Sequence, residues 1–377
     1  MKFTIPRWFL RDIIAPFFVT RLLLCFVGWW ALAWADPPSW EGWEIRASGS
    51  GGPIGYNTHA QYLRSPGLAL VNMWARWDTG WYMSIALDGY EFKPGEQCNT
   101  GFFPLYPMLM RWIAKPNWRM DQRAIVIAGI LISNVSLVAA LALLHKLIRL
   151  DHDEKIASRA MLYALVLPMT IFFSAVYTES IFLLTTIAAF YFARRGKWWI
   201  AGLFGAFAGI SRVQGFLLTC GLAVEYWQQR RKRVDASTVL FPGLAFSAHV
   251  CALRYWFGTW LVLPISQSAW ERHFVLPWHT TGTHMEIFGA FFLIAVCAAC
   301  WFWTRCSYAV FANVIFWFNM CVRPLCSIGR YGFALFPVYI VLARALRGRV
   351  VEWICVLGGL AFSCFCMARF ALWYWVH

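Results

Sequence analysis

Long apolar segments recur along almost the whole chain, and clusters of lysine and arginine separate many of them. The first segment runs from about Ile13 to Ala35. Several of the others are shorter than the roughly 20 residues that cross the hydrocarbon core perpendicularly, so some helices must be partly embedded or meet within the bundle. The pattern predicts an all-α polytopic membrane protein with about 11 transmembrane helices. The later segments lie at about 123–147, 161–176, 180–193, 198–210, 213–227, 238–256, 286–303, 307–322, 332–343 and 350–373.

The composition excludes a water-soluble protein. Of the 377 residues, 60% are hydrophobic and 14% are charged, and the mean hydropathy is +0.55. No soluble domain of this length buries so large an apolar fraction in one core. The net charge of +15 would suit a protein that binds nucleic acid, but here the basic residues stand between apolar segments and therefore indicate topology. We expect residues 1–377 to form a single membrane-embedded domain without a nucleic-acid partner.

Basic residues predict which ends of the segments face the cytoplasm. Arg7 and Arg11 precede the first segment and place the amino terminus on that side. Ala33-Trp34-Ala35 is typical of a signal-peptidase site, but the apolar stretch before it exceeds the roughly 7–15 residues of a signal peptide, so we expect a retained first helix. The further clusters all fall on the cytoplasmic side if every break is a turn: Lys146/Arg149/Lys155/Arg159, Arg194/Arg195/Lys197, Arg230–Arg233 and Arg344/Arg347/Arg349.

The same alternation predicts the outward face. Residues 36–122, 257–285 and the short stretches Ala175–Glu179 and Arg323–Arg330 would lie outside, and so would Arg212. These segments carry the irregular, polar and aromatic sequence, whereas the cytoplasmic loops are short and basic. We therefore expect chemistry on the extracytoplasmic side.

Residues 36–122 form the first outer loop. Its beginning, residues 36–67, is rich in glycine, serine and proline and is typical of a flexible loop. From Leu68 to Tyr90, apolar residues recur at helical spacing, which predicts an amphipathic helix lying in the membrane interface. Asp78 follows Trp74 by four residues and so falls at the edge of the apolar face, where its carboxylate can point into a cleft.

Acids and arginines on the outer segments are the candidate site residues. Arg76-Trp77-Asp78 would also suit an ordinary interface, with tryptophan in the aromatic belt and the acid in water. Glu179 stands between two apolar segments that almost no loop separates, where a buried acid is costly unless it is paired or functional. Arg212 can bind a phosphate through its planar fork, although a side chain that snorkels to the interface would also explain it.

The order of the outer motifs is more specific than any single motif. Taken in sequence, they resemble the PIG-V mannosyltransferase family, which includes the eukaryotic GPI mannosyltransferase 2 and its bacterial relatives. The resemblance covers roughly residues 68–340. It rests on Arg76-Trp77-Asp78, Phe102-Phe103-Pro104-Leu105-Tyr106-Pro107, Ser174-Ala175-Val176-Tyr177-Thr178-Glu179-Ser180, Ser211-Arg212-Val213-Gln214-Gly215, Gln267-Ser268-Ala269-Trp270 and Ser327-Ile328-Gly329-Arg330-Tyr331 with Phe336-Pro337.

The resemblance implies the GT-C glycosyltransferase fold and a sugar, mannose in this family, carried on dolichyl or another polyprenyl phosphate. It implies a multi-pass protein of the bacterial inner membrane, or of the endoplasmic reticulum in a eukaryote. The family's acids fall on Asp78 and Glu179, and its late Arg-Tyr pair falls on Arg330 and Tyr331. The long 36–67 loop departs from the family pattern, as does Asp88, which stands where relatives often have histidine and leaves the acceptor open.

Transfer of a sugar from a phosphate needs a base for the incoming hydroxyl and cations for the leaving group. One carboxylate suffices for direct displacement with inversion. We predict Asp78 as the base, Arg212 and Arg330 as phosphate partners, and Glu179 as a residue that orients hydroxyl groups or fixes an arginine. Further substrate-binding candidates are Arg76, Trp77, Tyr177, Gln267, Trp270 and Tyr331.

No metal or other cofactor is expected. Asp151-His152-Asp153 is similar to the Asp-x-Asp of metal-dependent enzymes that use nucleotide sugars, but it lies in a basic cytoplasmic loop and is interpreted as a solvated turn. The twelve cysteines lie mostly in apolar segments, where thiols behave as small hydrophobic groups.

The expected partners are a polyprenyl-phosphate-linked sugar, the lipid bilayer and an acceptor that is a glycan, a glycolipid or a protein. A transporter, or a flippase-like protein that binds lipid without glycosyl transfer, is the alternative class. Transporters place ionisable groups near the bilayer midplane and show internal repeats, whereas the candidate groups here gather at one face.

Overall fold

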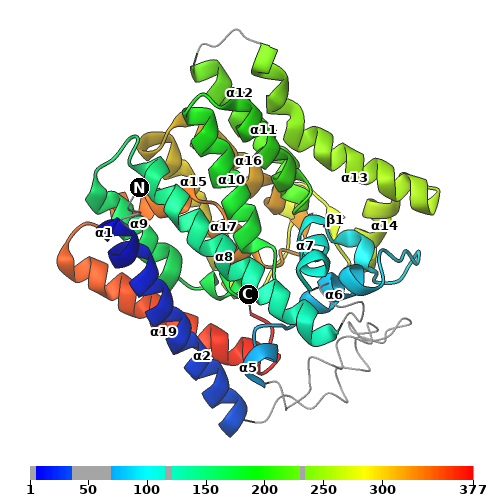
Figure 1. Cartoon of the computed structure of the whole chain (residues 1–377), viewed down its shortest axis with the longest axis horizontal. Helices are drawn as coiled ribbons and strands as arrows, with labels where there is room; N and C mark the ends of the chain where they lie inside the picture. Colours follow the sequence, from blue (N-terminus) through cyan, green and yellow to red (C-terminus); the bar gives the residue numbers. More distant parts are fainter. Residues whose placement is uncertain (1–5, 36–68, 115–120, 230–233, 377) are drawn as a thin grey trace, which may run out of the picture.

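The computed structural model describes residues 6–35, 69–114, 121–229 and 234–376. Helices form nearly all of its regular structure, as Figure 1 shows. The predicted flexible loop at 36–67 and the basic cluster Arg230–Arg233 lie outside the described residues.

Five helical stretches in the described part are long and apolar enough to cross a membrane. Each coincides with one of the predicted apolar segments. They consist of α1 (Arg7–Phe9), η1 (Leu10–Ile14) and α2 (Ala15–Trp34), which are continuous; α8 (Gln122–Ile148); η6 (Val234–Leu240) with α13 (Phe241–Phe257); α15 (His284–Trp303); and α19 (Arg349–Ala371).

Shorter helices overlap the remaining apolar segments and pack inside the bundle. α10 packs between α8 and α11, and most of its side chains are buried. Short apolar helices that meet within the bundle were expected from the length of the segments, and the prediction of an all-α multi-pass membrane protein is confirmed. These helices are α9 (Glu154–Val166), α10 (Glu179–Arg194), α11 (Trp198–Gly209), α12 (Leu218–Gln228), α16 (Cys306–Met320) and α18 (Pro337–Ala345).

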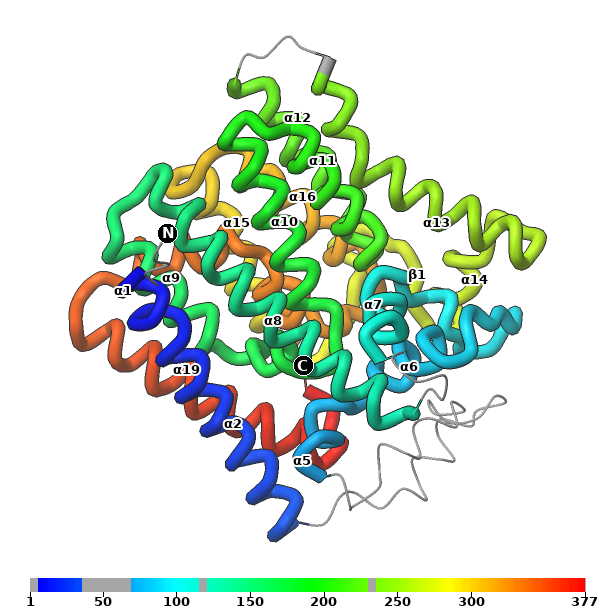
Figure 2. Tube along the Cα trace, viewed as in Figure 1, coloured from blue at the N-terminus to red at the C-terminus, as the bar shows by residue number. Residues whose placement is uncertain are grey.

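The distribution of side chains suits a lipid environment. α2 and α19 pack together along one edge of the bundle, as the blue and red tubes in Figure 2 show. Both turn large apolar residues outward, for example Phe18, Leu22 and Ile354. Arg21 of α2 instead points inward, where it donates hydrogen bonds to the carbonyl oxygens of Leu165 and Thr170 and to Ser174 Oγ. A cation on a membrane helix is thus satisfied within the protein.

The segments predicted to face outward carry short elements. The two strands pair antiparallel, with His273 opposite Arg323, and so join the 257–285 segment to the chain after α16. The short elements are α5 (Ala69–Asn72), α6 (Thr79–Leu87), η3 (Asn99–Gly101), α7 (Leu105–Ala114), η4 (Thr170–Phe173), η5 (Val213–Leu217), α14 (Val262–Ala269), β1 (His273–Phe274), η7 (Pro277–His279), β2 (Val322–Arg323) and α17 (Ile328–Phe333).

The amphipathic helix predicted from Leu68 to Tyr90 is wrong as a continuous element. Its described part is two helices, α5 and α6, and the chain between them turns, with Trp77 at a φ of 53°. Nearly all of α6 is buried, so it does not lie in the interface with one apolar face. Tertiary contacts explain the break, because the Trp77 ring packs edge-on against Trp373 and Trp375 after α19.

The segment predicted at 161–176 also differs from its expected form. α9 ends at Val166, and the chain then passes through η4 and an irregular stretch to Glu179. Pro168 accounts for the stop, since the residue before a proline is driven out of the helical region, and Leu167 is indeed extended at φ −67° and ψ 153°.

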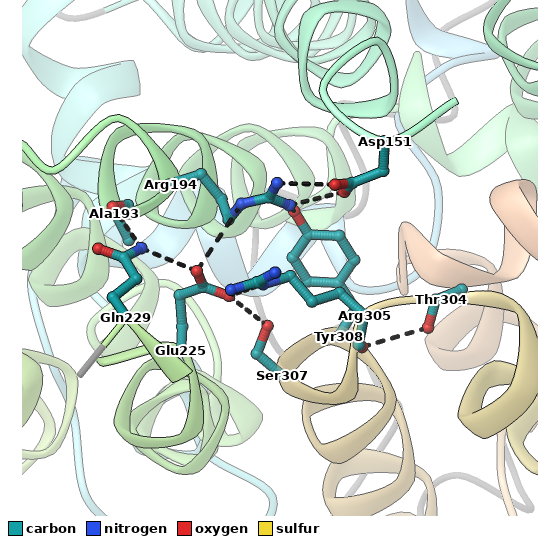
Figure 3. A network of polar contacts seen from close by, with 9 residues as sticks. All are labelled: Asp151, Ala193, Arg194, Glu225, Gln229, Thr304, Arg305, Ser307 and Tyr308. Carbon is teal, nitrogen blue, oxygen red and sulfur yellow. Dashed lines mark hydrogen bonds and ion pairs between the residues drawn. The ribbon is translucent and has the colours of Figure 1, made fainter. Parts of the chain in front are cut away.

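A polar network joins the helix ends at the side of the bundle away from the outer candidates (Figure 3). Arg194, the last residue of α10, donates two hydrogen bonds to Asp151, of 2.6 and 2.7 Å, and one to Tyr308 Oη. Glu225 of α12 is fully buried and accepts hydrogen bonds from Arg305 Nε at 2.7 Å and Ser307 Oγ at 2.6 Å. The network ties α10, α12 and α16 to the turn between α8 and α9.

This network also accounts for the Asp151-His152-Asp153 turn. Asp151 belongs to the ion pair with Arg194, and Asp153 accepts a hydrogen bond from the Ile156 N–H at the start of α9. Both carboxylates therefore have structural partners.

Candidate active site

Four of the predicted residues form one line of alternating charges. Asp78 Oδ2 lies 2.8 Å from Arg330 Nη1. Arg330 Nε lies 3.2 Å from Glu179 Oε1, and the same oxygen is 2.8 Å from Arg212 Nη1. Residues that are far apart in the sequence thus meet in one place, as the predicted constellation requires.

This line of charges is largely removed from solvent. Glu179 is 1% exposed, Arg330 6% and Arg212 9%, while the Asp78 side chain is 16% exposed. Burial of ions is costly unless each has a partner of opposite sign, and here every ion has one. Glu179 gains further stabilisation because it is the first residue of α10, where the helix dipole favours a negative charge. Within the described chain its second oxygen, Oε2, has no hydrogen-bond partner.

Asp78 is held by a turn rather than by a helix face. It occupies the position before α6, yet its side chain does not cap the helix. Its N–H donates to Tyr177 Oη at 3.3 Å, and that hydroxyl donates to the carbonyl oxygen of Arg76 at 3.1 Å. Tyr177 therefore clamps the backbone on both sides of Trp77, whose positive φ is unusual for a large residue. Its hydroxyl thereby fixes the backbone at Asp78.

Arg212 lies between α11 and η5, where the chain doubles back. A Cβ on Gly215 would stand 1.8 Å from the Ala208 carbonyl oxygen, so this close approach requires glycine. The Arg212 guanidinium lies over the Tyr331 ring at 4.9 Å, and the Arg330 guanidinium lies over the same ring at 5.3 Å and over Tyr177 at 5.2 Å. Aromatic faces thus support both cations beside the acids.

These residues border a cavity of about 870 Å³. Asp78 is the only acid in its lining within the described chain, and its Oδ1 has no hydrogen-bond partner there. Glu179 lies behind the two arginines and does not line the cavity. The predicted site residues that line it are Trp77, Asp78, Arg212, Gln267, Trp270, Arg330 and Tyr331.

Arg76 and Tyr177, predicted to bind substrate, do not line the cavity. Arg76 donates from Nε to the Ala371 carbonyl oxygen at 3.0 Å and lies over the Trp373 ring at 4.8 Å. It therefore anchors the turn before Asp78 to the end of α19. The sequence could not separate Arg76 from Asp78, because both stand in the same motif.

Phenylalanine rings form the apolar part of the cavity wall. Phe216 contacts Phe246 of α13 at 4.9 Å between ring centroids and Phe318 of α16 at 5.9 Å. Phe318 in turn contacts Phe274, which is 73% exposed. We call Phe246, Phe216, Phe318 and Phe274 the aromatic track, because their contacts are continuous from the cavity to the protein surface.

Several lining residues are not distinguished by the sequence. Arg272 follows the Gln267–Trp270 motif by two residues, but nothing in the sequence separates it from other outer arginines. Gln214 donates a hydrogen bond to Asn319 at 2.9 Å, and both amides line the cavity. Such amides are suited to sugar hydroxyl groups.

Part of the chain is similar to known mannosyltransferases. A family model described as Mannosyltransferase (PIG-V) matches residues 65–231, a range that holds Asp78, Glu179 and Arg212. GPI alpha-1,6-mannosyltransferase 2 of Mus musculus is 28% identical over 149 residues, which cover 38% of this chain and 29% of that protein. The Rattus norvegicus protein of the same name is 28% identical over 155 residues, which cover 40% and 31%.

The matched part of the chain therefore spans under a third of the length of these relatives. Among solved structures, the Archaeoglobus fulgidus oligosaccharyltransferase tethered with an acceptor peptide aligns with a TM-score of 0.43 and 12% identity, over 95% of this chain and 55% of that one. Across residues 65–231 the chain carries the sequence pattern of the PIG-V mannosyltransferases, the family that the order of its motifs predicts.

Proposed function

We propose that the protein is a membrane glycosyltransferase of the GT-C type that transfers mannose from a polyprenyl-phosphate donor to an acceptor hydroxyl on the extracytoplasmic side. One observation carries the proposal: a single carboxylate, Asp78, faces a cavity in which arginines stand beside it. A base next to cations is the arrangement that sugar transfer from a phosphate requires. The acceptor is a glycan, a glycolipid or a protein.

In the proposed reaction the acceptor oxygen attacks C1 of the sugar, and the bond between C1 and the phosphate oxygen breaks. Asp78 takes the hydroxyl proton on Oδ1 while Oδ2 stays paired with Arg330. The electron pair of the broken bond leaves with the polyprenyl phosphate, whose growing charge the arginines stabilise. Attack and departure on opposite faces of the sugar give inversion at C1.

The aromatic track supports a lipid-linked donor rather than a soluble one. It runs along the cavity wall to an exposed phenylalanine, and α13, which contributes Phe246, also presents exposed Leu244 and Trp256. A polyprenyl chain needs an apolar path of this kind while its phosphate meets the arginines. A nucleotide sugar would bring a polar base and ribose to the same wall, where they would lose their hydration.

The two ends of α10 support the extracytoplasmic side. Glu179 begins this helix at the cavity, and Arg194 ends it within the network of basic helix ends. Basic residues gather on the cytoplasmic side of membrane proteins, so the opposite end of α10 faces outward.

The decisive experiment measures consumption of labelled polyprenyl-phosphate mannose by the purified protein in nanodiscs with a panel of acceptors. Wild type is expected to release polyprenyl phosphate, and Asp78→Asn is expected to fold but lose at least ~100-fold in turnover. Asp121→Asn is a matched control, because Asp121 only caps α8 and asparagine caps a helix equally well. Near wild-type turnover in Asp78→Asn would refute the role of the base. A protein that binds the donor but never consumes it would instead belong to the flippase-like class.

A further inference from the structure

Arg272 is a cation of the cavity that forms no ion pair with an acid of the described residues. Its side chain lines the cavity together with Arg212 and Arg330. Those two arginines pair with Glu179 and Asp78, whereas Arg272 forms no side-chain hydrogen bond or ion pair with the described residues. An arginine usually finds a partner when it is partly buried, so an unpaired one in a cavity wall is suited to an anionic ligand.

Backbone hydrogen bonds fix the segment around Arg272, although its guanidinium has no partner among the described residues. α14 ends just before it, and the N–H groups of Trp270 and Arg272 both donate to the Gln267 carbonyl oxygen, at 3.1 and 3.0 Å. Directly after it, His273 pairs with Arg323 across the two strands. The backbone position of Arg272 at the cavity wall is therefore fixed on both sides.

The three guanidinium groups gather near one phenol. Burial raises the pKa of Tyr331, but the charges of Arg272, Arg330 and Arg212 outweigh burial and bring the pKa below its ordinary value. Tyr331 belongs to α17, outside the five membrane-length helices. The charge of Arg272 therefore acts on Tyr331 together with the charges of the two paired arginines.

Among the described residues of this site, the arginines carry one more charge than the carboxylates. Asp78 and Glu179 neutralise Arg330 and Arg212, and Arg272 leaves one positive charge. The phosphodiester of a lipid-linked sugar carries one negative charge, which would complete the balance. We infer that Arg272 binds the phosphate of a polyprenyl-phosphate ligand beside Arg212 and Arg330, and supplies the one positive charge that no acid of the described site balances. This inference rests on the proposed function, because it assigns the residue that holds the proposed donor.

The test measures binding rather than turnover. The full chain in nanodiscs is titrated with polyprenyl phosphate, and separately with the uncharged polyprenol, for wild type, Arg272→Gln and Arg272→Lys. We expect Arg272→Gln to weaken polyprenyl phosphate binding at least about tenfold and Arg272→Lys to weaken it less, because lysine keeps the charge but loses the fork. Polyprenol binding should not change.

Arg323→Gln is the matched control. Arg323 is exposed, lies opposite His273 and is not part of the cavity lining, so its loss changes the net charge equally. Equal binding of polyprenyl phosphate by Arg272→Gln and wild type would overturn the inference, and so would an equal loss of polyprenol affinity or an equal effect of Arg323→Gln. Wild type that binds polyprenyl phosphate through Arg272 but transfers no sugar would refute the proposed transfer and leave the phosphate site intact.

Discussion

Asp78 and Arg330 are 252 residues apart in the sequence and form an ion pair of 2.8 Å. The pair joins the proposed base to a proposed phosphate partner. A substitution of either residue therefore leaves the other without its ion-pair partner. Arg330 also contacts Glu179, which contacts Arg212. Effects of substitutions within such a group are not additive, and each variant has to be compared with a matched change outside the group.

Arg330→Lys is expected to lower kcat/KM for the lipid-linked donor at least about tenfold while leaving acceptor affinity unchanged. Lysine keeps the charge, but its single ammonium group cannot pair with Asp78 and Glu179 in the way that two nitrogens of the guanidinium do. Arg212→Lys should act in the same direction. The measurement is steady-state kinetics with each substrate varied in turn. Arg344→Lys, whose arginine donates to one carbonyl at the other end of the bundle, should have little effect. Weaker acceptor binding with normal donor kinetics would assign these arginines to the acceptor instead.

Glu179→Gln should lower the thermal stability of the protein. The substitution leaves Asp78 as the one acid for two buried guanidinium groups, those of Arg330 and Arg212. Loss of one member of a buried pair costs about 3–5 kcal/mol. Polyprenyl phosphate should restore more stability to this variant than to wild type, because the ligand supplies the missing negative charge. Thermal shifts with and without the lipid measure the effect.

Glu225→Gln provides the comparison for Glu179→Gln. Glu225 is also buried and also contacts two arginines, Arg305 and Arg194, but it lies at the far end of the bundle. It should lose stability without gaining any response to polyprenyl phosphate. An equal response in both variants would contradict a phosphate site beside Glu179.

Tyr177→Phe should reduce turnover while costing only about 1–2 kcal/mol of stability. The substitution keeps the ring under Arg330 but removes the hydroxyl that links Asp78 N–H to the Arg76 carbonyl oxygen. Tyr106→Phe is matched in burial and loses a hydroxyl bonded to Gly129 and Ser133, away from Asp78. Comparable turnover in the two variants would show that Tyr177 does not position the base.

The orientation in the membrane can be tested with single cysteines in a background without native cysteines. Ser48→Cys should react with a membrane-impermeant thiol reagent in intact cells, and Ser237→Cys should not, because the exposed Ser237 lies in η6 at the basic end of α13. The reverse pattern would place the cavity in the cytoplasm and reopen the case for a nucleotide-sugar donor.

Apolar periodicity was sufficient to predict the helices, because hydrophobic runs of this length have few alternatives in a membrane. It failed at Trp77 and after Val166. At Trp77 the cause is tertiary, since contacts with Trp373 and Trp375 decide the local backbone. After Val166 the cause was visible in the sequence, because Pro168 marks the end of α9.

The acids and arginines of the candidate site could be selected from the motifs, but their pairing could not. Asp78, Glu179 and Arg330 come from three distant segments, and only the fold brings them within ion-pair distance. For the same reason the motifs do not reveal that Arg76 and Tyr177, predicted to bind substrate, lie outside the cavity lining and hydrogen bond to the backbone. Arg272 was missed because the absence of an acidic partner is a property of the folded chain.

In the proposed reaction, the length of α10 determines the depth of the site in the membrane. Its 16 residues rise about 24 Å, whereas the hydrocarbon core of a bilayer is about 30 Å thick. If Arg194 marks the proposed cytoplasmic boundary, Glu179 lies below the level of the opposite headgroups, and any tilt of the helix places it deeper. The phosphate of a lipid-linked donor reaches this depth when the polyprenyl chain shifts slightly deeper into the bilayer. The acceptor has to lower its hydroxyl below the membrane surface, which favours slender or membrane-attached acceptors over bulky soluble ones.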